Sequence, residues 1–201
     1  MSGYTQAMEK LIEQLGRLPG IGARSAERIA FHLLDAPKDE ALALADAIAA
    51  LKTKTRLCSR CYHLTEDDPC PICSDPTRDT GLICVVEQSR DLINIESTGT
   101  FRGVYHVLMG QVAPLEGVEP SDLTIDALIQ RVRSTGVREV LLATNPTMEG
   151  DGTALHIASL LAAAPNVTVS RLARGLPSGS QLEYANKSML ADAIAGRQKM
   201  G

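Results

Sequence analysis

The stretch Leu82-Ile-Cys-Val-Val-Glu87 decides the fold. Its five consecutive apolar residues are typical of a strand that is buried on both faces, and Cys84 within it is most simply a core residue. Further strands are expected at 104–109, 139–143 and 167–170, and helices at 91–97, 123–134 and 153–164. Strands that alternate with helices predict an α/β fold built on a parallel, doubly wound sheet.

Further helices are expected in the sequence before and after this sheet region. Met8, Leu11, Ile12 and Leu15 recur at helical spacing, and further helices are expected at 23–34, 39–54 and 187–195. A loop-like segment rich in cysteine separates the first helices from the sheet, and loops are expected at 110–121 and 175–180. The chain therefore divides into a helical domain, a cysteine module, a sheet domain and a helical tail, over residues 1–55, 56–79, 80–173 and 174–201.

Composition favours an ordinary globular protein of 201 residues with a net charge of −4. No apolar run reaches the roughly 18 residues that a membrane span needs. The first residues lack the basic and apolar regions of a signal peptide, so we expect a cytoplasmic protein. Because thiols stay reduced in that compartment, its five cysteines are expected to be metal ligands or core residues rather than disulfides.

The charge is unevenly distributed along the chain. Residues 1–60 contain nine Lys/Arg and seven Asp/Glu, whereas residues 61–201 contain eleven and seventeen. A DNA-binding surface is therefore expected in the N-terminal third, and the acidic remainder is a candidate for binding proteins or metals. Four Tyr and two Phe, with no Trp, leave little material for stacking on bases.

Four cysteines form the pattern Cys58-x2-Cys61-x8-Cys70-x2-Cys73. Two CxxC pairs can place four thiolates in a tetrahedron, which suits one structural Zn²⁺ per chain and leaves no open position for catalysis. The alternative, a redox-active dithiol, accounts poorly for two pairs separated by eight residues.

Leu18-Pro-Gly-Ile-Gly22 connects two of the expected helices. Gly20 and Gly22 permit a tight turn and, with Ile21, present backbone amides to a phosphate at the start of the next helix. Arg24 and Arg28 lie four residues apart on one face of that helix. The motif resembles a helix-hairpin-helix, which binds DNA without reading its sequence; the alternative is a plain helix–helix turn.

Acidic residues follow two of the expected strands. Glu87 ends the first, and Thr144-Asn-Pro-Thr-Met-Glu-Gly150 follows another. This arrangement resembles the Toprim domain of topoisomerases and primases, in which a Glu and an Asp-x-Asp hold magnesium. Asn145 and Thr147 occupy the two aspartate positions, so metal-dependent phosphoryl chemistry is not expected. The remaining carboxylates, Glu87, Asp91, Glu149 and Asp151, form a candidate partner-binding patch, or are simply solvated loop residues.

The order of these modules, with the strings LPGIGARSAERIAFHLL, TRDTGLICVVE, GVYHVLMG and ATNPTMEGDGTA, resembles the RecR family of bacterial recombination mediators over nearly the whole chain. The tail reads GLPSGSQLEYAN where the family usually has GLPVGGDLEYAD. The resemblance implies a non-enzymatic, nucleoid-associated DNA-repair protein. It also implies a ring-like homo-oligomer, commonly a tetramer, that acts with RecO and RecF to load RecA at single-stranded gaps.

In this interpretation residues 1–55 bind DNA through Gly20, Ile21, Gly22, Arg24 and Arg28, and Glu87, Asp91 and Glu149 bind a protein partner. Residues 174–201 mediate oligomerisation. Two other classes of function stay open at this point. One is an active Toprim nuclease or primase-like enzyme, and the other is a zinc-stabilised protein adaptor that does not bind DNA.

Overall fold

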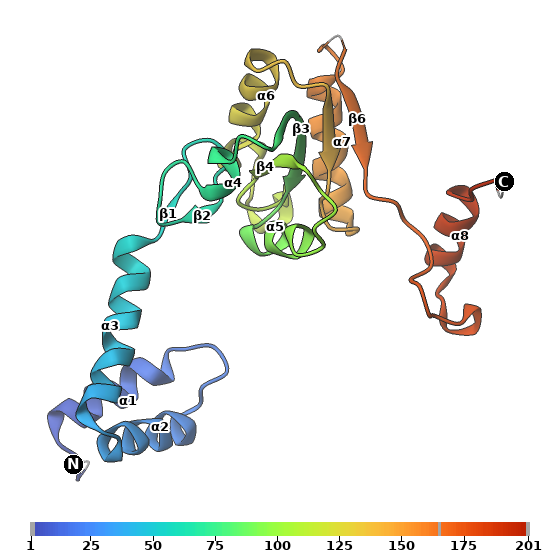
Figure 1. Ribbon diagram of the computed structural model, residues 1–201. Helices are drawn as coiled ribbons and strands as arrows, with labels where there is room; N and C mark the ends of the chain where they lie inside the picture. The colour runs from blue at the N-terminus through green and yellow to red at the C-terminus, as the bar shows by residue number, and fades with distance from the viewer. Residues whose placement is uncertain (1–2, 165, 200–201) are drawn as a thin grey trace. The chain divides into compact units, whose positions relative to one another are not determined.

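The computed structural model describes residues 3–164 and 166–199, and the chain divides into two compact units, Met1–Thr55 and Arg56–Gly201 (Figure 1). The first unit consists of the helices α1 (Gln6–Gly16), α2 (Ala23–Asp35) and α3 (Lys38–Lys54). The predicted bounds of α2 and α3 agree with these to within one residue at each end.

The first unit has little core of its own. Among residues 3–55, Ala26 and Ala30 alone are buried, and both belong to α2. Large apolar side chains stay exposed instead, among them Leu34 at 68%, Leu51 at 64% and Ile48 at 59%. The three helices therefore leave much of their apolar surface open to solvent.

The second unit is built on a four-stranded parallel sheet in the order β4-β3-β5-β6. Its strands are β3 (Asp79–Val86), β4 (Gly103–Val107), β5 (Glu139–Leu142) and β6 (Thr168–Arg171). β3 lies between β4 and β5, with Ile83 opposite both Val104 and Val140. The predicted parallel α/β sheet is confirmed, and the apolar run that ends before Glu87 forms one of its two inner strands.

Helices cover both faces of this sheet. α6 (Ile125–Ser134) and α7 (Met148–Leu161) pack on the face that receives Ile83 and Val85. Cys84 and Val86 point to the other face, where they pack with Leu92 of α5 (Ser89–Glu96). Cys84 is completely buried, as predicted, and burial raises the pKa of its thiol to about 12.

The cysteine segment is more ordered than predicted. It contains the antiparallel strands β1 (Arg56–Leu57) and β2 (Leu64–Thr65) and the short helix α4 (Pro71–Ser74). A backbone hydrogen bond also joins it to the sheet, because the N–H of Val107 in β4 donates to the carbonyl of Cys61 at 2.8 Å.

Arg131 of α6 reinforces this junction. Its Nη1 donates to the carbonyl of Tyr105 in β4 at 2.7 Å and to that of Arg60 in the cysteine segment at 3.2 Å. One guanidinium thus connects a helix, a strand and the cysteine segment.

Several observed bounds differ from the predicted ones. α7 begins at Met148, five residues before the predicted 153, because the Thr147 hydroxyl caps it by accepting the N–H of Gly150 at 3.0 Å. The predicted loop 110–121 holds the 3-10 turn η1 (Pro114–Glu116) and the start of η2 (Pro120–Asp122). In the tail, η3 (Leu182–Tyr184) precedes α8 (Lys187–Ala195), whose predicted bounds are confirmed.

Candidate functional sites

The four cysteines of the motif converge on one point. Their Sγ atoms all lie within 4.8 Å of one another, with Cys58, Cys61 and Cys70 buried and Cys73 partly buried. Each CxxC pair lies on a tight turn. The N–H of Tyr62 donates to the Cys58 carbonyl at 2.9 Å, and the N–H of Ser74 donates to the Cys70 carbonyl at 3.0 Å.

These thiols cannot all ionise together without a cation. A hydrogen bond from Cys61 lowers the pKa of Cys73 to about 6, whereas burial raises the pKa of Cys70 to about 11. Zn²⁺ would be held by all four thiolates, because it prefers sulfur ligands in a tetrahedron and its charge offsets their repulsion. With four protein ligands the coordination sphere is closed, so the metal's contribution there is structural.

The turn between α1 and α2 is tight and open to solvent. The N–H of Ile21 donates to the Leu18 carbonyl at 3.1 Å, and Gly20 has a φ of +79°, which favours glycine. Gly22 is the N-cap of α2 and supplies no side-chain cap, so the first amides of this helix have no capping side chain. A Cβ added at Gly20 or Gly22 would meet no atom within 4 Å, which leaves room for an approaching phosphate.

The cations beside this turn differ in their partners. Arg17 is paired with Glu13 at 2.6 Å. Arg24 and Arg28 are both exposed, and within residues 3–164 and 166–199 they take part in none of the observed ion pairs. Two unpaired guanidiniums and the positive end of α2 therefore belong to the same helix.

At the carboxyl edge of the sheet, Glu87 is buried, with 5% of the residue exposed. Its Oε1 accepts the backbone N–H of Asn145 at 2.8 Å, and its Oε2 accepts the Asn145 side-chain amide at 2.6 Å. Glu87 is therefore neither a solvated loop residue nor a free carboxylate. Its charge is stabilised by two hydrogen bonds inside the fold.

This edge does not fit magnesium in the Toprim manner. Of the three positions that carry the Toprim ligands, Glu87 alone holds a carboxylate, and both of its oxygens accept hydrogen bonds from Asn145. Thr147, at the second aspartate position, uses its hydroxyl as the N-cap of α7. A hard divalent cation needs several free oxygen ligands, and these residues do not provide them.

The other predicted acidic residues are not gathered into one patch of free carboxylates. Asp91 accepts the N–H of Gln88 at 2.9 Å and so caps α5. Asp151 binds Arg174 and, at 2.8 Å, Arg171, and these hydrogen bonds and charges lower its pKa. Glu149 is exposed in the first turn of α7.

Comparisons with known proteins match all three modules. The Toprim domain model matches residues 81–173, the RecR helix-hairpin-helix model residues 8–52, and the RecR four-cysteine zinc finger model residues 55–75. The chain is 54% identical over 200 residues to recombination protein RecR of Rhodopirellula baltica and 52% to that of Rubrobacter xylanophilus, covering 100% of both chains in each case. It is 50% identical over 198 residues to that of Cutibacterium acnes, covering 98% of both chains.

The chain belongs to the RecR family. Its role is therefore in DNA recombination and repair, and its four close cysteines form the family's zinc finger. The helix-hairpin-helix and the Toprim domain predicted from the sequence are confirmed as domains. Among the residues that the structure describes, no helix has both the length and the apolar character required to cross a membrane.

Two residues with clear roles were missed in the sequence of this RecR chain. Asn145 was identified as a lost metal ligand, although its position after β5, beside the end of β3, could have indicated a hydrogen-bond donor to Glu87. Arg131 gave no signal, because a lone arginine at the end of an amphipathic helix is usually solvated.

Proposed function

We propose that this RecR-family chain is a non-catalytic DNA-binding mediator that acts with RecO and RecF to load RecA at single-stranded gaps. The observation that supports it most is the turn before α2, where Gly20, Ile21 and Gly22 present an uncapped helix start and Arg24 and Arg28 add charge. Amides and guanidiniums placed in this way recognise phosphates rather than bases, so binding is independent of DNA sequence.

The mediator role needs no catalysis by the chain. Supporting this, the Toprim edge has its Glu87 carboxylate held by Asn145, so two-metal phosphoryl transfer has no ligand set there. An assay for magnesium-dependent cleavage of single-stranded and duplex DNA tests this, and cleavage that disappears in Glu87→Gln would favour the nuclease alternative.

We further propose that the chain functions as a ring-like homo-oligomer, and specifically as a tetramer. A groove of about 460 Å³ lies among α1, α2 and α3, lined with apolar side chains such as Leu11, Leu44 and Ile48. A helical unit of this size with Ala26 and Ala30 as its buried residues gains stability if a second copy covers that groove. Several weak hairpins in one ring also raise the effective concentration of contacts.

The domain roles follow from this proposal: residues 1–55 bind DNA, 56–79 hold zinc, 80–173 form the Toprim domain and 174–201 mediate oligomerisation. The tail supports its assigned role with exposed apolar residues, including Leu182 and Ile194 at 65% each. Solution mass at several protein concentrations, for the parent and for Ile48→Glu and Ile194→Glu, tests both interfaces. A parent that stays monomeric at all concentrations would contradict the ring.

A protein partner is proposed to bind at the carboxyl edge of the sheet, the edge that carries Glu87, Asp91 and Glu149. Since Glu87 is buried and Asp91 caps a helix, Glu149 is the residue that can meet a basic partner such as RecO directly. Glu149→Ala should weaken a calorimetric titration with RecO and leave DNA binding unchanged. Glu66→Ala serves as the control of equal charge, because Glu66 is exposed in the zinc finger, whereas Glu116 lines the same hollow as Glu87.

The DNA contact is tested with Arg24→Ala/Arg28→Ala. Each phosphate contact adds about 0.9 to the salt slope on duplex DNA, so the double variant should flatten that slope by about 1.8 and lower affinity equally for all sequences. Arg17→Ala is the matched control, because Arg17 is already paired with Glu13. A double variant that binds like the parent at every salt concentration would place DNA elsewhere.

A further inference from the structure

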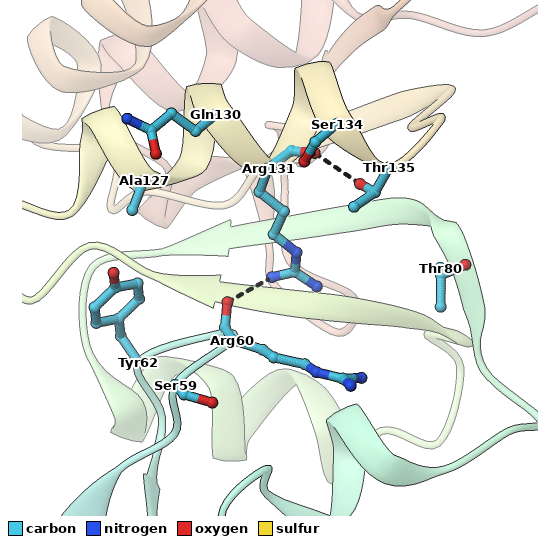
Figure 2. A pocket seen from close by; sticks show the side chains of 9 residues that line it. All are labelled: Ser59, Arg60, Tyr62, Thr80, Ala127, Gln130, Arg131, Ser134 and Thr135. Carbon is cyan, nitrogen blue, oxygen red and sulfur yellow. Dashed lines mark hydrogen bonds between the residues drawn. The ribbon is translucent and has the colours of Figure 1, made fainter.

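A cavity of about 430 Å³ lies between the zinc finger and α6, beside the four-cysteine site and apart from the carboxyl edge of the sheet (Figure 2). The zinc finger contributes three of its lining residues, the start of β3 contributes one, and α6 with its carboxyl end contributes the rest. They are Ser59, Arg60, Tyr62, Thr80, Ala127, Gln130, Arg131, Ser134 and Thr135. The cavity belongs entirely to the second unit of the chain.

The lining has the chemistry of an anion site. Arg60 and Arg131 are both positively charged, and the nine lining residues include no carboxylate. Figure 2 shows no hydrogen bond from the hydroxyls of Ser59, Tyr62 or Thr80 to the other lining residues. The Ser59 hydroxyl is bound to the carboxylate of Asp68, so the hydroxyls of Tyr62 and Thr80 are the ones available to a ligand in the cavity.

Arg131 is held in a fixed orientation at the cavity wall. Its Nη1 donates to the carbonyl of Tyr105, which does not line the cavity, and to the carbonyl of Arg60, which does. A guanidinium has five N–H groups, and these two hydrogen bonds do not use the three on Nε and Nη2, which can donate to a ligand. The hydroxyls of Ser134 and Thr135 donate to the Arg131 carbonyl at 3.2 and 2.7 Å, which anchors the same residue at its backbone.

The charges in the cavity favour a phosphate. The carboxyl end of α6 carries roughly half a negative charge, and Asp68, bound to Ser59 and close to Arg60, carries one more. Arg60 and Arg131 carry one positive charge each, so a positive excess of roughly half a charge remains. Guanidinium groups match the geometry of phosphate oxygens. A volume of about 430 Å³ also leaves room for the sugar attached to that phosphate.

We propose that this cavity binds a backbone phosphate of single-stranded DNA, as a contact additional to the helix-hairpin-helix. The proposal rests on the DNA-binding function proposed above. It gives the zinc finger a second role, because the finger holds Ser59, Arg60 and Tyr62 against α6 and so forms one wall of the cavity.

Two variants test the cavity while sparing Arg131, whose removal would also disturb the fold. Arg60→Ala removes one charge together with a hydrogen bond to the Cys73 carbonyl at 3.3 Å. Gln130→Glu places a carboxylate on the exposed cavity rim with almost no change in shape. Arg133→Ala is the matched control, because Arg133 is exposed on the same helix but lines a different hollow. Zinc content and thermal unfolding are measured for each variant. If Arg60→Ala loses zinc, the DNA affinity of Gln130→Glu alone decides whether the cavity binds DNA.

Affinity for a short oligo(dT) is measured at several salt concentrations. One contact on single-stranded DNA adds about 0.7 to the salt slope, which corresponds to a gain in affinity of about fivefold between roughly 1 M and 0.1 M salt. We expect Arg60→Ala and Gln130→Glu each to weaken binding by at least about that factor and Arg133→Ala to leave it unchanged. Equal effects of all three, or no effect of the two cavity variants, would overturn the proposal.

Further arms separate the remaining possibilities. If Arg24→Ala/Arg28→Ala binds DNA like the parent while the cavity variants weaken it, the hairpin proposal fails and the cavity stands. If the cavity variants lose affinity for thymidine monophosphate or for a poly-glutamate peptide, but not for oligo(dT), the ligand is a free nucleotide or an acidic protein and the DNA assignment is wrong. Photo-crosslinking of 5-iododeoxyuridine-containing oligonucleotide to the peptide containing Tyr62 would support it directly.

Discussion

Replacing Asn145 by aspartate should convert the Glu87 site from a stable hydrogen-bonded pair into a strained pair of carboxylates. In the parent, the Asn145 amide donates to Glu87 Oε2 at 2.6 Å, and Glu87 is 5% exposed. Asn145→Asp keeps the side-chain shape and the backbone donor at 2.8 Å. It removes the amide proton and adds a negative charge beside a buried one.

The magnitude follows from these two changes. A hydrogen bond to a charged group contributes about 1.5–3 kcal/mol. Two carboxylates about 3 Å apart repel by up to about 5 kcal/mol at an effective dielectric constant of about 20, and sharing one proton relieves most of this. We therefore expect Asn145→Asp to lower the free energy of unfolding by roughly 3 kcal/mol at pH 7.

The sign of the pH dependence is opposite to that of a carboxylate held by an ion pair. The two carboxylates take up one proton with a raised pKa, so the native state binds a proton that the unfolded chain lacks at neutral pH. Stability of the variant should therefore recover as the pH falls toward 5 and be lost again as it rises. Mg²⁺ should also stabilise the variant, and not the parent, since two free carboxylates can bind it.

Urea denaturation at pH 7 and pH 5, with and without millimolar Mg²⁺, measures these effects. Asn145→Ala is the control: it removes the donor without adding charge, so it should lose about half as much stability and show no recovery at pH 5. An Asn145→Asp protein as stable as the parent at pH 7 would refute the reasoning.

Three further predictions concern packing, protonation and zinc. Gly150→Ala would place a Cβ 2.2 Å from the Asn145 carbonyl oxygen and 2.8 Å from Glu87 Oε1, so thermal unfolding should show a loss of about 3 kcal/mol in the free energy of unfolding. Gly152→Ala is the control on the same helix: its Cβ meets nothing within 4 Å, so it should be neutral or stabilising. His106 is fully buried, and burial lowers its pKa to about 4. Between about pH 6.5 and 4 the unfolded chain therefore binds a proton that the native protein lacks, so the free energy of unfolding should fall by about 3 kcal/mol as the pH is lowered through this range. Chemical denaturation of His106→Gln should show no such fall. Cys70→Ser, or removal of zinc with a chelator, should unfold the zinc finger, as elemental analysis and circular dichroism would report, because metal binding supplies roughly 10 kcal/mol or more to such sites; a metal-free protein with an unchanged spectrum would contradict this.

Local patterns carried most of what could be predicted from the sequence. The apolar run that ends before Glu87 identified the central strand, and the cysteine spacing identified a four-thiolate site, because both depend on residues that are neighbours in the chain. The first turn of α7 was missed since Gly150 and Gly152 have low helix propensity, and the cap at Thr147 outweighs them.

Interactions between distant residues could not be predicted in the same way. Glu87 and its partner Asn145 are 58 residues apart, so the burial of that carboxylate depends on the register of β3 against β5. The role of Arg131 likewise requires knowing that the zinc finger lies against β4. Neither fact has a local signature.

The zinc finger also closes one side of the sheet. β4 is an outermost strand, and its free backbone groups would form a template on which another chain could add a strand. The Val107 N–H is taken by the Cys61 carbonyl, and the Tyr105 carbonyl by Arg131, so no such template is offered at these positions. Loss of zinc would release Cys61 and uncover the backbone of β4, so metal-starved protein should self-associate through intermolecular β-strands rather than simply lose one small domain.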